Sequence, residues 1–249
     1  MPDTVALAYR QWRLERKMFW RNPSAAFFSF AFPLIFLLLF GAIFSGDRKN
    51  LNVIIPGIAG MSIMATTFTA LAINMTFLRE EGVLKRIRGT PQPSGSYLSG
   101  VAANAVTNAA IQIVIVTLAG KLLFGIGWPK DLVELVVFAV AGVAAMASLG
   151  VAFSHVIPNF DAAPAYTNVV FLPAIFISGV FFDVGTAPAF LTDIADVLPL
   201  THIIQGLRAG FVTGAPLSDH LGDLAVVAAW AVFGIVFAVR GFTWEQTRD

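Results

Sequence analysis

Long apolar stretches with almost no charge recur along the whole chain, separated by short polar intervals. Six of them reach the roughly 20 residues that a helix needs to cross a bilayer. They cover residues 25–44, 53–78, 99–124, 132–157, 162–182 and 221–239. The pattern predicts an all-α polytopic membrane protein with six transmembrane helices, folded as a single transmembrane domain over residues 1–249.

The composition agrees with a membrane protein. Of the 249 residues, 57% are hydrophobic and 12% are charged, whereas soluble domains carry about 25% charged residues. The net charge of +1 excludes a nucleic-acid reader that works through net charge. The absence of cysteine excludes disulfide scaffolds and thiolate metal sites.

Most of the 16 lysines and arginines fall on one side of the predicted spans. They precede the first span, follow the second, or lie in the C-terminal tail: Arg10, Arg13, Arg16, Lys17, Arg21, Arg79, Lys85, Arg86, Arg88, Arg240 and Arg248. Short cytoplasmic loops carry such an excess of positive charge. Both termini are therefore predicted to be cytoplasmic.

Residues 4–21 form an amphipathic stretch before the first span. At 100° per residue, the apolar side chains Val5, Tyr9, Trp12 and Phe19 fall on one side. On the other side fall Arg10, Arg13, Lys17 and Arg21. We expect an interfacial helix lying in the plane of the membrane, either as a basic topology anchor or as a helix that also contacts a partner subunit.

Residues 79–98 form a second charged segment, between the second and third spans. The acidic residues Glu80 and Glu81 are expected to open a short helix, and basic residues to close it, which suits the helix dipole. Gly89 and Pro91 would end it. We expect a docking site for a partner, the alternative being a plain surface helix; its candidate residues are Glu80, Glu81, Gly82, Leu84, Lys85, Arg86 and Arg88.

Residues 183–220, on the opposite side, are too long for an ordinary loop. They contain two amphipathic stretches of about 11 residues, each about 16 Å long as a helix, or half a bilayer. We expect an external re-entrant helix pair, the alternative being a helical lid on the outer surface. Its marked residues are Asp183, Pro199 between the helices, Thr201 as a possible cap, and Arg208.

Polar side chains also occur inside the predicted spans. Asn104, Asn108 and Gln112 follow one another at i+4 and form one stripe on the third span. Weaker polar positions are Thr66, Asn74, Asn168 and Ser178. Such residues serve either as interhelical hydrogen-bonding groups or as a surface for translocation or dimerisation.

The chain lacks the residues that would supply energy or catalysis. No G-x-x-x-x-G-K-[ST] motif occurs. The three histidines are scattered along the sequence, so we expect no catalytic or metal-binding residues and no bound cofactor. No ionisable residue lies near the middle of a predicted span, although proton-driven carriers usually need one. An uphill transporter of this kind would need energy from another polypeptide.

Two motifs resemble a known family. Glu80-Glu81-Gly82-Val83-Leu84-Lys85-Arg86 leads to Thr90-Pro91, and Ile177-Ser178-Gly179-Val180-Phe181-Phe182 precedes the external pair with Pro199-Leu200-Thr201. With the topology, they resemble the ABC-2 type permeases, the transmembrane subunits of bacterial drug, lipid and polysaccharide exporters. Asp183, where many members have proline, and Val83, where threonine is common, depart from the pattern and bear on the sub-family.

The resemblance implies a transport subunit in the bacterial plasma membrane. Two permeases, identical or different, would work with two P-loop ATPase subunits that bind ATP and Mg²⁺, and residues 79–98 would seat on the ATPase. The expected substrate is an amphipathic small molecule, a drug or a lipid, moved outward. The alternatives are a polysaccharide or glycolipid exporter and a non-transporting membrane scaffold subunit.

Overall fold

The computed structural model describes residues 4–88 and 94–241. Within these residues every regular element is helical, which confirms the predicted all-α class. Four helical stretches are long and apolar enough to cross a membrane: Arg48–Glu80, Ser99–Phe124, Leu132–Phe153 and Leu217–Arg240. Two further apolar helical stretches, Ser29–Ile43 and Ala163–Ile177, are shorter than 18 residues.

The helices have the following bounds. They are α1 (Thr4–Arg21), α2 (Pro23–Ile43), α3 (Arg48–Met64), α4 (Ala70–Glu80), α5 (Val83–Arg88), α6 (Ser94–Phe124), α7 (Leu132–Phe153), α8 (Ala163–Ile177), α9 (Ala189–Ala195), α10 (Pro199–Arg208) and α11 (Leu221–Gly241). Short π-helical segments, η1 (Ala65–Thr69) and η3 (Ala209–Thr213), continue α3 and α10, and 3₁₀ turns η2 (Val184–Thr186) and η4 (Leu217–His220) precede α9 and α11.

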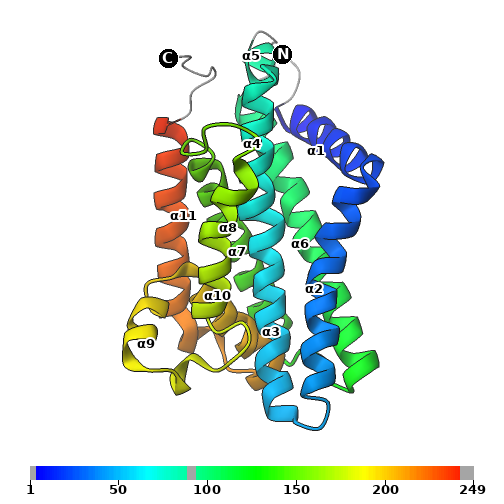
Figure 1. Ribbon diagram of the computed structural model, residues 1–249, viewed down its shortest axis with the longest axis vertical. Coiled ribbons are helices and arrows are strands. Elements are labelled where there is room, and N and C mark those ends of the chain that lie inside the picture. Colours follow the sequence, from blue (N-terminus) through cyan, green and yellow to red (C-terminus); the bar gives the residue numbers. More distant parts are fainter. Residues whose placement is uncertain (1–3, 89–93, 242–249) are drawn as a thin grey trace.

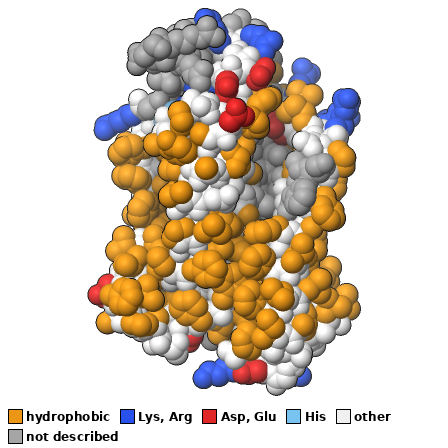
Figure 2. Space-filling model, viewed as in Figure 1, with side chains coloured by type: hydrophobic (Ala, Val, Ile, Leu, Met, Phe, Trp, Pro, Cys, Tyr) orange, Lys and Arg blue, Asp and Glu red, His pale blue; other side chains and the backbone are white. Residues whose placement is uncertain are grey.

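The long helices run side by side, with α1 crossing one end of the bundle (Figure 1). We call this end, which carries α1, α5 and the C-terminus of α11, the basic end. The turn between α2 and α3 lies at the opposite end, as does α9. Hydrophobic side chains cover the middle of the visible face, and charged side chains gather at its two ends (Figure 2). This distribution suits a molecule whose middle lies in hydrocarbon.

The core of the bundle is built around α3. Every residue from Ile54 to Met64 is buried, because α2, α6, α7 and α10 all pack against this helix. Helix α3 continues through η1 into α4, so residues 48–80 form one helical rod. The rod is longer than the predicted span 53–78 at both ends.

Glycines let α10 approach its neighbours closely. A Cβ atom at Gly60 of α3 would lie 2.6 Å from Cγ1 of Ile204, and one at Gly206 of α10 would overlap the ring of Phe138. Ile203 of α10 contacts Gly142, which lies ten residues into α7, or about 15 Å from its start. The first turns of α10 therefore lie deep in the bundle rather than on its outer surface.

The first helix of the external segment is shorter than the sequence suggested. Helix α9 has 7 residues and α10 has 10 before its π-helical continuation. The expectation that Thr201 caps a helix was wrong, because Pro199 at the first turn starts α10 two residues earlier and places Leu198 at the N-cap.

Candidate functional site

The charged segment after the second long helix has a different helix boundary from the predicted one. Glu80 is the last residue of α4 and Glu81 is its C-cap, so these acidic residues close a helix instead of opening one. Gly82 then adopts φ +66°, a conformation that glycine reaches without a Cβ penalty. Helix α5 begins at Val83 as a separate six-residue helix.

The end of α4 is fixed to the loop between α7 and α8. The guanidinium of Arg79, which is 9% exposed, donates to the carbonyl oxygen of Ile157 at 2.7 Å. The carboxylate of Glu80 accepts a hydrogen bond from the backbone N–H of Phe160 at 2.6 Å, and the rings of Phe77 and Phe160 are in contact. These contacts join the end of α4, next to α5, to the loop that precedes α8.

The candidate docking side chains on α5 lie at the tip of the basic end. Lys85 and Arg86 are exposed, and Arg86 donates to the carbonyl oxygen of Glu81 at 3.0 Å. The side chains of Leu84 and Arg88, and the predicted stop at residues 89–91, lie outside the described part. Two basic side chains on a short helix present a compact positive surface at the far end of the rod.

Helix α1 packs on α6 through polar side chains. Residues 4–21 are helical as predicted. Of the expected apolar side, Val5 and Tyr9 are 73% and 59% exposed, whereas Trp12 and Phe19 are partly buried. Gln11 and Glu15 occupy the buried side, with the Gln11 amide donating to Glu15 at 2.8 Å. The sequence pattern did not predict that Gln11 and Glu15 are buried, because such a pattern predicts burial only for apolar residues.

Two further hydrogen bonds hold α1 to α6. The indole N–H of Trp12 donates to Thr107 at 3.0 Å, and Arg16 donates to the side-chain oxygen of Asn108. Burial of Glu15 raises the pKa of its carboxyl group, and burial, then the nearby Glu15 charge, raises the pKa of the Tyr97 hydroxyl. Both directions follow from the cost of charging a desolvated group.

The polar stripe on α6 meets α1 and α2 within the same chain. Asn108 contacts Arg16, and the buried Gln112 amide donates to the carbonyl oxygen of Phe30 at 3.5 Å. Asn104 is partly buried, and its side-chain oxygen has no hydrogen-bond partner among the described residues. The stripe thus supplies hydrogen bonds to two neighbouring helices.

The other marked polar positions are dispersed. Thr66 lies in η1 and donates to the carbonyl oxygen of Ser62 at 2.7 Å, and Asn74 is partly buried on α4. Asn168 is exposed on α8, whereas Ser178 is buried at its C-cap. The structure does not gather these residues into one site.

The marked residues of the external segment lie around α10. Asp183 and Arg208 form an ion pair at 3.4 Å, which ties the segment after α8 to the end of α10. Thr201 is buried and its hydroxyl is unpaired. Pro199 starts α10 where that helix contacts the centre of the bundle.

A cluster that the sequence did not indicate joins α7, α10 and α11. His202 on α10 and His220 in η4 contact opposite carboxylate oxygens of Asp223, at 2.6 and 3.0 Å. His220 also lies 3.9 Å from the fully buried Glu134 of α7. The hydrogen bond to Asp223 raises the pKa of His202. Two of the three histidines, taken as scattered from the sequence, therefore meet through the fold.

This cluster fastens helices and is not arranged as a metal centre. Within the described residues, no group of three or more His, Asp or Glu is positioned to hold a metal ion. Its signal in the sequence was weak, because Glu134 and Asp223 are 89 positions apart and only the fold brings them together.

Comparisons with known proteins agree with this architecture. The model of the ABC-2 type transporter family matches residues 3–212. Nodulation protein J of Rhizobium meliloti (strain 1021) is 28% identical over 211 residues, covering 81% of this chain and 80% of that protein. The daunorubicin resistance ABC transporter permease protein DrrB1 of Streptomyces coeruleorubidus is 27% identical over 218 residues, covering 79% and 74%.

A third relative is longer than this chain. The linearmycin resistance permease protein LnrN of Bacillus subtilis (strain 168) is 27% identical over 187 residues, which cover 72% of this chain and 46% of LnrN. The family match covers most of the bundle, including α5 and α10. The chain therefore belongs to the ABC-2 type transporter family and is a membrane permease of an ABC transporter.

Proposed function

We propose that this chain is the permease subunit of an ATP-driven exporter that moves an amphipathic small molecule, a drug or a lipid, outward from the cytoplasm or the inner leaflet. In this proposal α2 and α8 complete six transmembrane helices, and α9 with α10 forms an external re-entrant pair. The basic end faces the cytoplasm of a bacterial cell, where positive charge accumulates.

One observation carries the proposal. The exposed basic helix α5 stands at the tip of the rod formed by residues 48–80, which is anchored through Arg79 and Glu80 to the base of α8. Force applied to α5 by a partner would reach the middle of the bundle directly. Because this chain has no P-loop, ATP and Mg²⁺ would bind to separate ATPase subunits that dock on α5.

Two other features support the outward transport of an amphipathic compound. Two relatives are named for resistance to daunorubicin and to linearmycin, and removal from the cell is one route to resistance. The hydrogen bonds from Trp12 and Arg16 to α6 would let α1 pass part of the movement to the bundle. Two permeases, identical or different, would form the path between them.

The docking role is tested by reversing charge on α5. With Lys85→Glu and Arg86→Glu together, we expect the permease to purify normally but to lose most stimulation of its ATPase subunit. The matched control is Arg48→Glu with Lys49→Glu, two adjacent exposed basic residues at the opposite end. Full stimulation by the Lys85 and Arg86 variant, measured as ATP hydrolysis in reconstituted vesicles, would contradict the proposal.

A further inference from the structure

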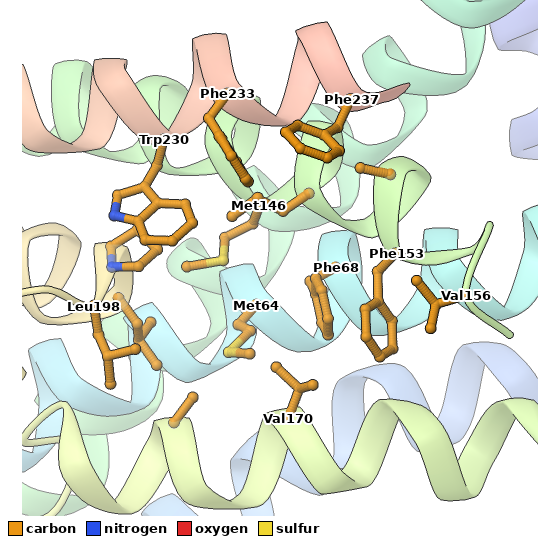
Figure 3. A pocket seen from close by; sticks show the side chains of 15 residues that line it. Met64, Phe68, Met146, Phe153, Val156, Val170, Leu198, Trp230, Phe233 and Phe237 are labelled. Carbon is orange, nitrogen blue, oxygen red and sulfur yellow. The ribbon is translucent and has the colours of Figure 1, made fainter. Parts of the chain in front are cut away.

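An apolar cavity of about 340 Å³ lies inside the bundle. It is bounded by α3 with η1, α7, α8, α11 and the start of α10, and every lining residue is apolar (Figure 3). The one polar atom among the lining side chains is the indole N–H of Trp230, which donates to the carbonyl oxygen of Val197 at 2.9 Å. The cavity therefore offers no side-chain hydrogen bond to a ligand.

The cavity is elongated along the helices. Trp230, Phe233 and Phe237 follow one another along α11, and Figure 3 shows their rings in a row on the side that faces the cavity. Seven residues separate the first from the last, which is about 10 Å of helix. Met146 and Phe153 mark the same length on α7. A narrow apolar space of this shape fits a single alkyl chain.

The position of the cavity points to one leaflet. Phe237 and Phe153 lie near the ends of α11 and α7 at the basic end, whereas the turn into α10, Leu198 to Leu200, closes the deep end. The cavity thus lies in the half of the membrane domain next to the basic end.

The open side of the cavity faces the bilayer. Helix α11 packs on α7 and α10, and α8 packs on η1, α4 and α10, and Figure 3 shows the cavity in the space between α8 and α11. The lining residues Phe233 and Phe237 of α11 are themselves 47% and 55% exposed. In a bilayer these surfaces meet lipid tails, so hydrocarbon is the medium from which the cavity is filled.

A cation follows the last cavity-lining residue of α11, toward the basic end. Arg240 is exposed in the last turn of α11, three residues beyond Phe237 and so on a neighbouring part of the same helix face. Its guanidinium is suited to bind a phosphate. A phospholipid whose tail enters the cavity from this end would bring its headgroup to Arg240.

We propose that the cavity is a lipid-binding site that holds one acyl chain of an anionic phospholipid from the leaflet next to the basic end. The tail packs against the rings of α11 and ends against the turn that begins α10. When the cavity is empty, the side chains that line it lack van der Waals contacts on that side, and an acyl chain would supply these contacts. Only the assignment to the inner leaflet rests on the proposed function.

The site is tested with a phosphatidylglycerol that carries a photoreactive diazirine within its acyl chain. The purified permease in detergent, without any ATPase subunit, is irradiated and the labelled peptides are identified by mass spectrometry. We expect labels on residues 146–153 and 230–237 well above those on the exposed face of α2, and saturable competition by unlabelled phosphatidylglycerol. Even labelling of all exposed helices would overturn the proposal.

Two neighbouring valines on α8 provide a matched pair. Val170 lines the cavity, whereas Val169 is 74% exposed on the outer surface. Val170→Trp would occupy space that the acyl chain needs and lower cavity labelling about ten-fold, which corresponds to about 1.4 kcal/mol. Val169→Trp should leave labelling unchanged. Equal labelling of the two variants, each checked for folding by circular dichroism, would contradict the site.

Competition on the unmodified protein separates the possible occupants. Displacement of the label by daunorubicin but not by unlabelled phosphatidylglycerol would overturn the lipid assignment in favour of a transported drug. Arg240→Ala should lower labelling by phosphatidylglycerol to that of the matching phosphatidylcholine probe. Saturable labelling without any stimulation of the ATPase subunit would support the lipid site and contradict the proposed exporter function. Normal stimulation without labelling would support the exporter function and contradict the lipid site.

Discussion

Glu15 is an ionisable residue whose side chain is buried in the folded protein. Its carboxyl group is 8% exposed between α1 and α6, with the Gln11 amide as its hydrogen-bond donor. Burial raises its pKa, since desolvation penalises the charged form. Ionisation of Glu15 is therefore disfavoured where α1 packs on α6.

Replacement by glutamine tests this cost. A folded-state pKa raised above the unfolded value gives stability that is present at acid pH and is lost as the pH rises through the raised pKa. Glu15→Gln should therefore raise the free energy of unfolding at pH 7 by about 1 kcal/mol, a typical size for a single substitution. Near pH 4 the substitution should have little effect. Unfolding in detergent at equal scan rates measures this.

The exposed Glu81 provides the control, because Glu81→Gln changes the same charge at the same end of the molecule. A Glu15→Gln gain that does not depend on pH would contradict the charge of Glu15 as its cause, and a loss at pH 7 would show that the carboxylate itself stabilises α1 on α6.

At the scale of elements, hydrogen bonds join the ends of helices to segments that are distant in the sequence. The pairs from Arg79 to Ile157 and from Glu80 to Phe160 join the rod to the loop before α8. The cluster at Asp223 joins α10 to α11 in the same way at the other end. The loop that precedes α8 is thus held by two hydrogen bonds from the end of α4.

The Glu80 contact has a direct readout in hydrogen exchange. With Glu80→Ala the amide of Phe160 loses its acceptor, so we expect exchange in peptides covering residues 157–163 to accelerate several-fold. Glu81→Ala, one residue along the chain, should leave these peptides unchanged. Mass spectrometry of both variants in nanodiscs makes the comparison, and unchanged exchange in Glu80→Ala would mean that this bond does not hold the loop.

The sequence predicted the positions of the helices more accurately than it predicted where they end and which residues they contact. Long apolar runs predicted α6 and α7 because hydropathy reports length directly. The end of α8 was missed, since residues 180–182 remain apolar after Gly179 turns the chain with φ +78°. The polar face of α1 and the Asp223 cluster depend on packing between distant segments, which periodicity in one segment does not contain.

At the scale of the whole molecule, charge and topology agree. Helices α1 and α5 and the end of α11 lie at the same end of the bundle (Figure 1), and this end carries most of the positive charge. The turns between α2 and α3 and between α6 and α7 lie at the other end. Such asymmetry sets the orientation of a protein as it is inserted.

The absence of cysteine makes this orientation directly measurable. Single-cysteine variants at exposed positions, Ser45→Cys and Ser218→Cys, should react with a membrane-impermeant maleimide on intact cells. Lys85→Cys should react only after the cells are permeabilised. The unmodified chain gives the blank, and the reverse pattern of labelling would place the basic end outside.

The rod of residues 48–80 is long enough to amplify a small change of tilt. Its 33 residues span about 50 Å at 1.5 Å per residue, although the hydrocarbon layer is only about 30 Å thick. A tilt of about 5° around its outer end would displace the tip that carries α5 by about 4 Å on that length. If an ATPase subunit docks on α5 as proposed, a small change in the tilt of this rod would therefore accompany a much larger displacement of the docked surface.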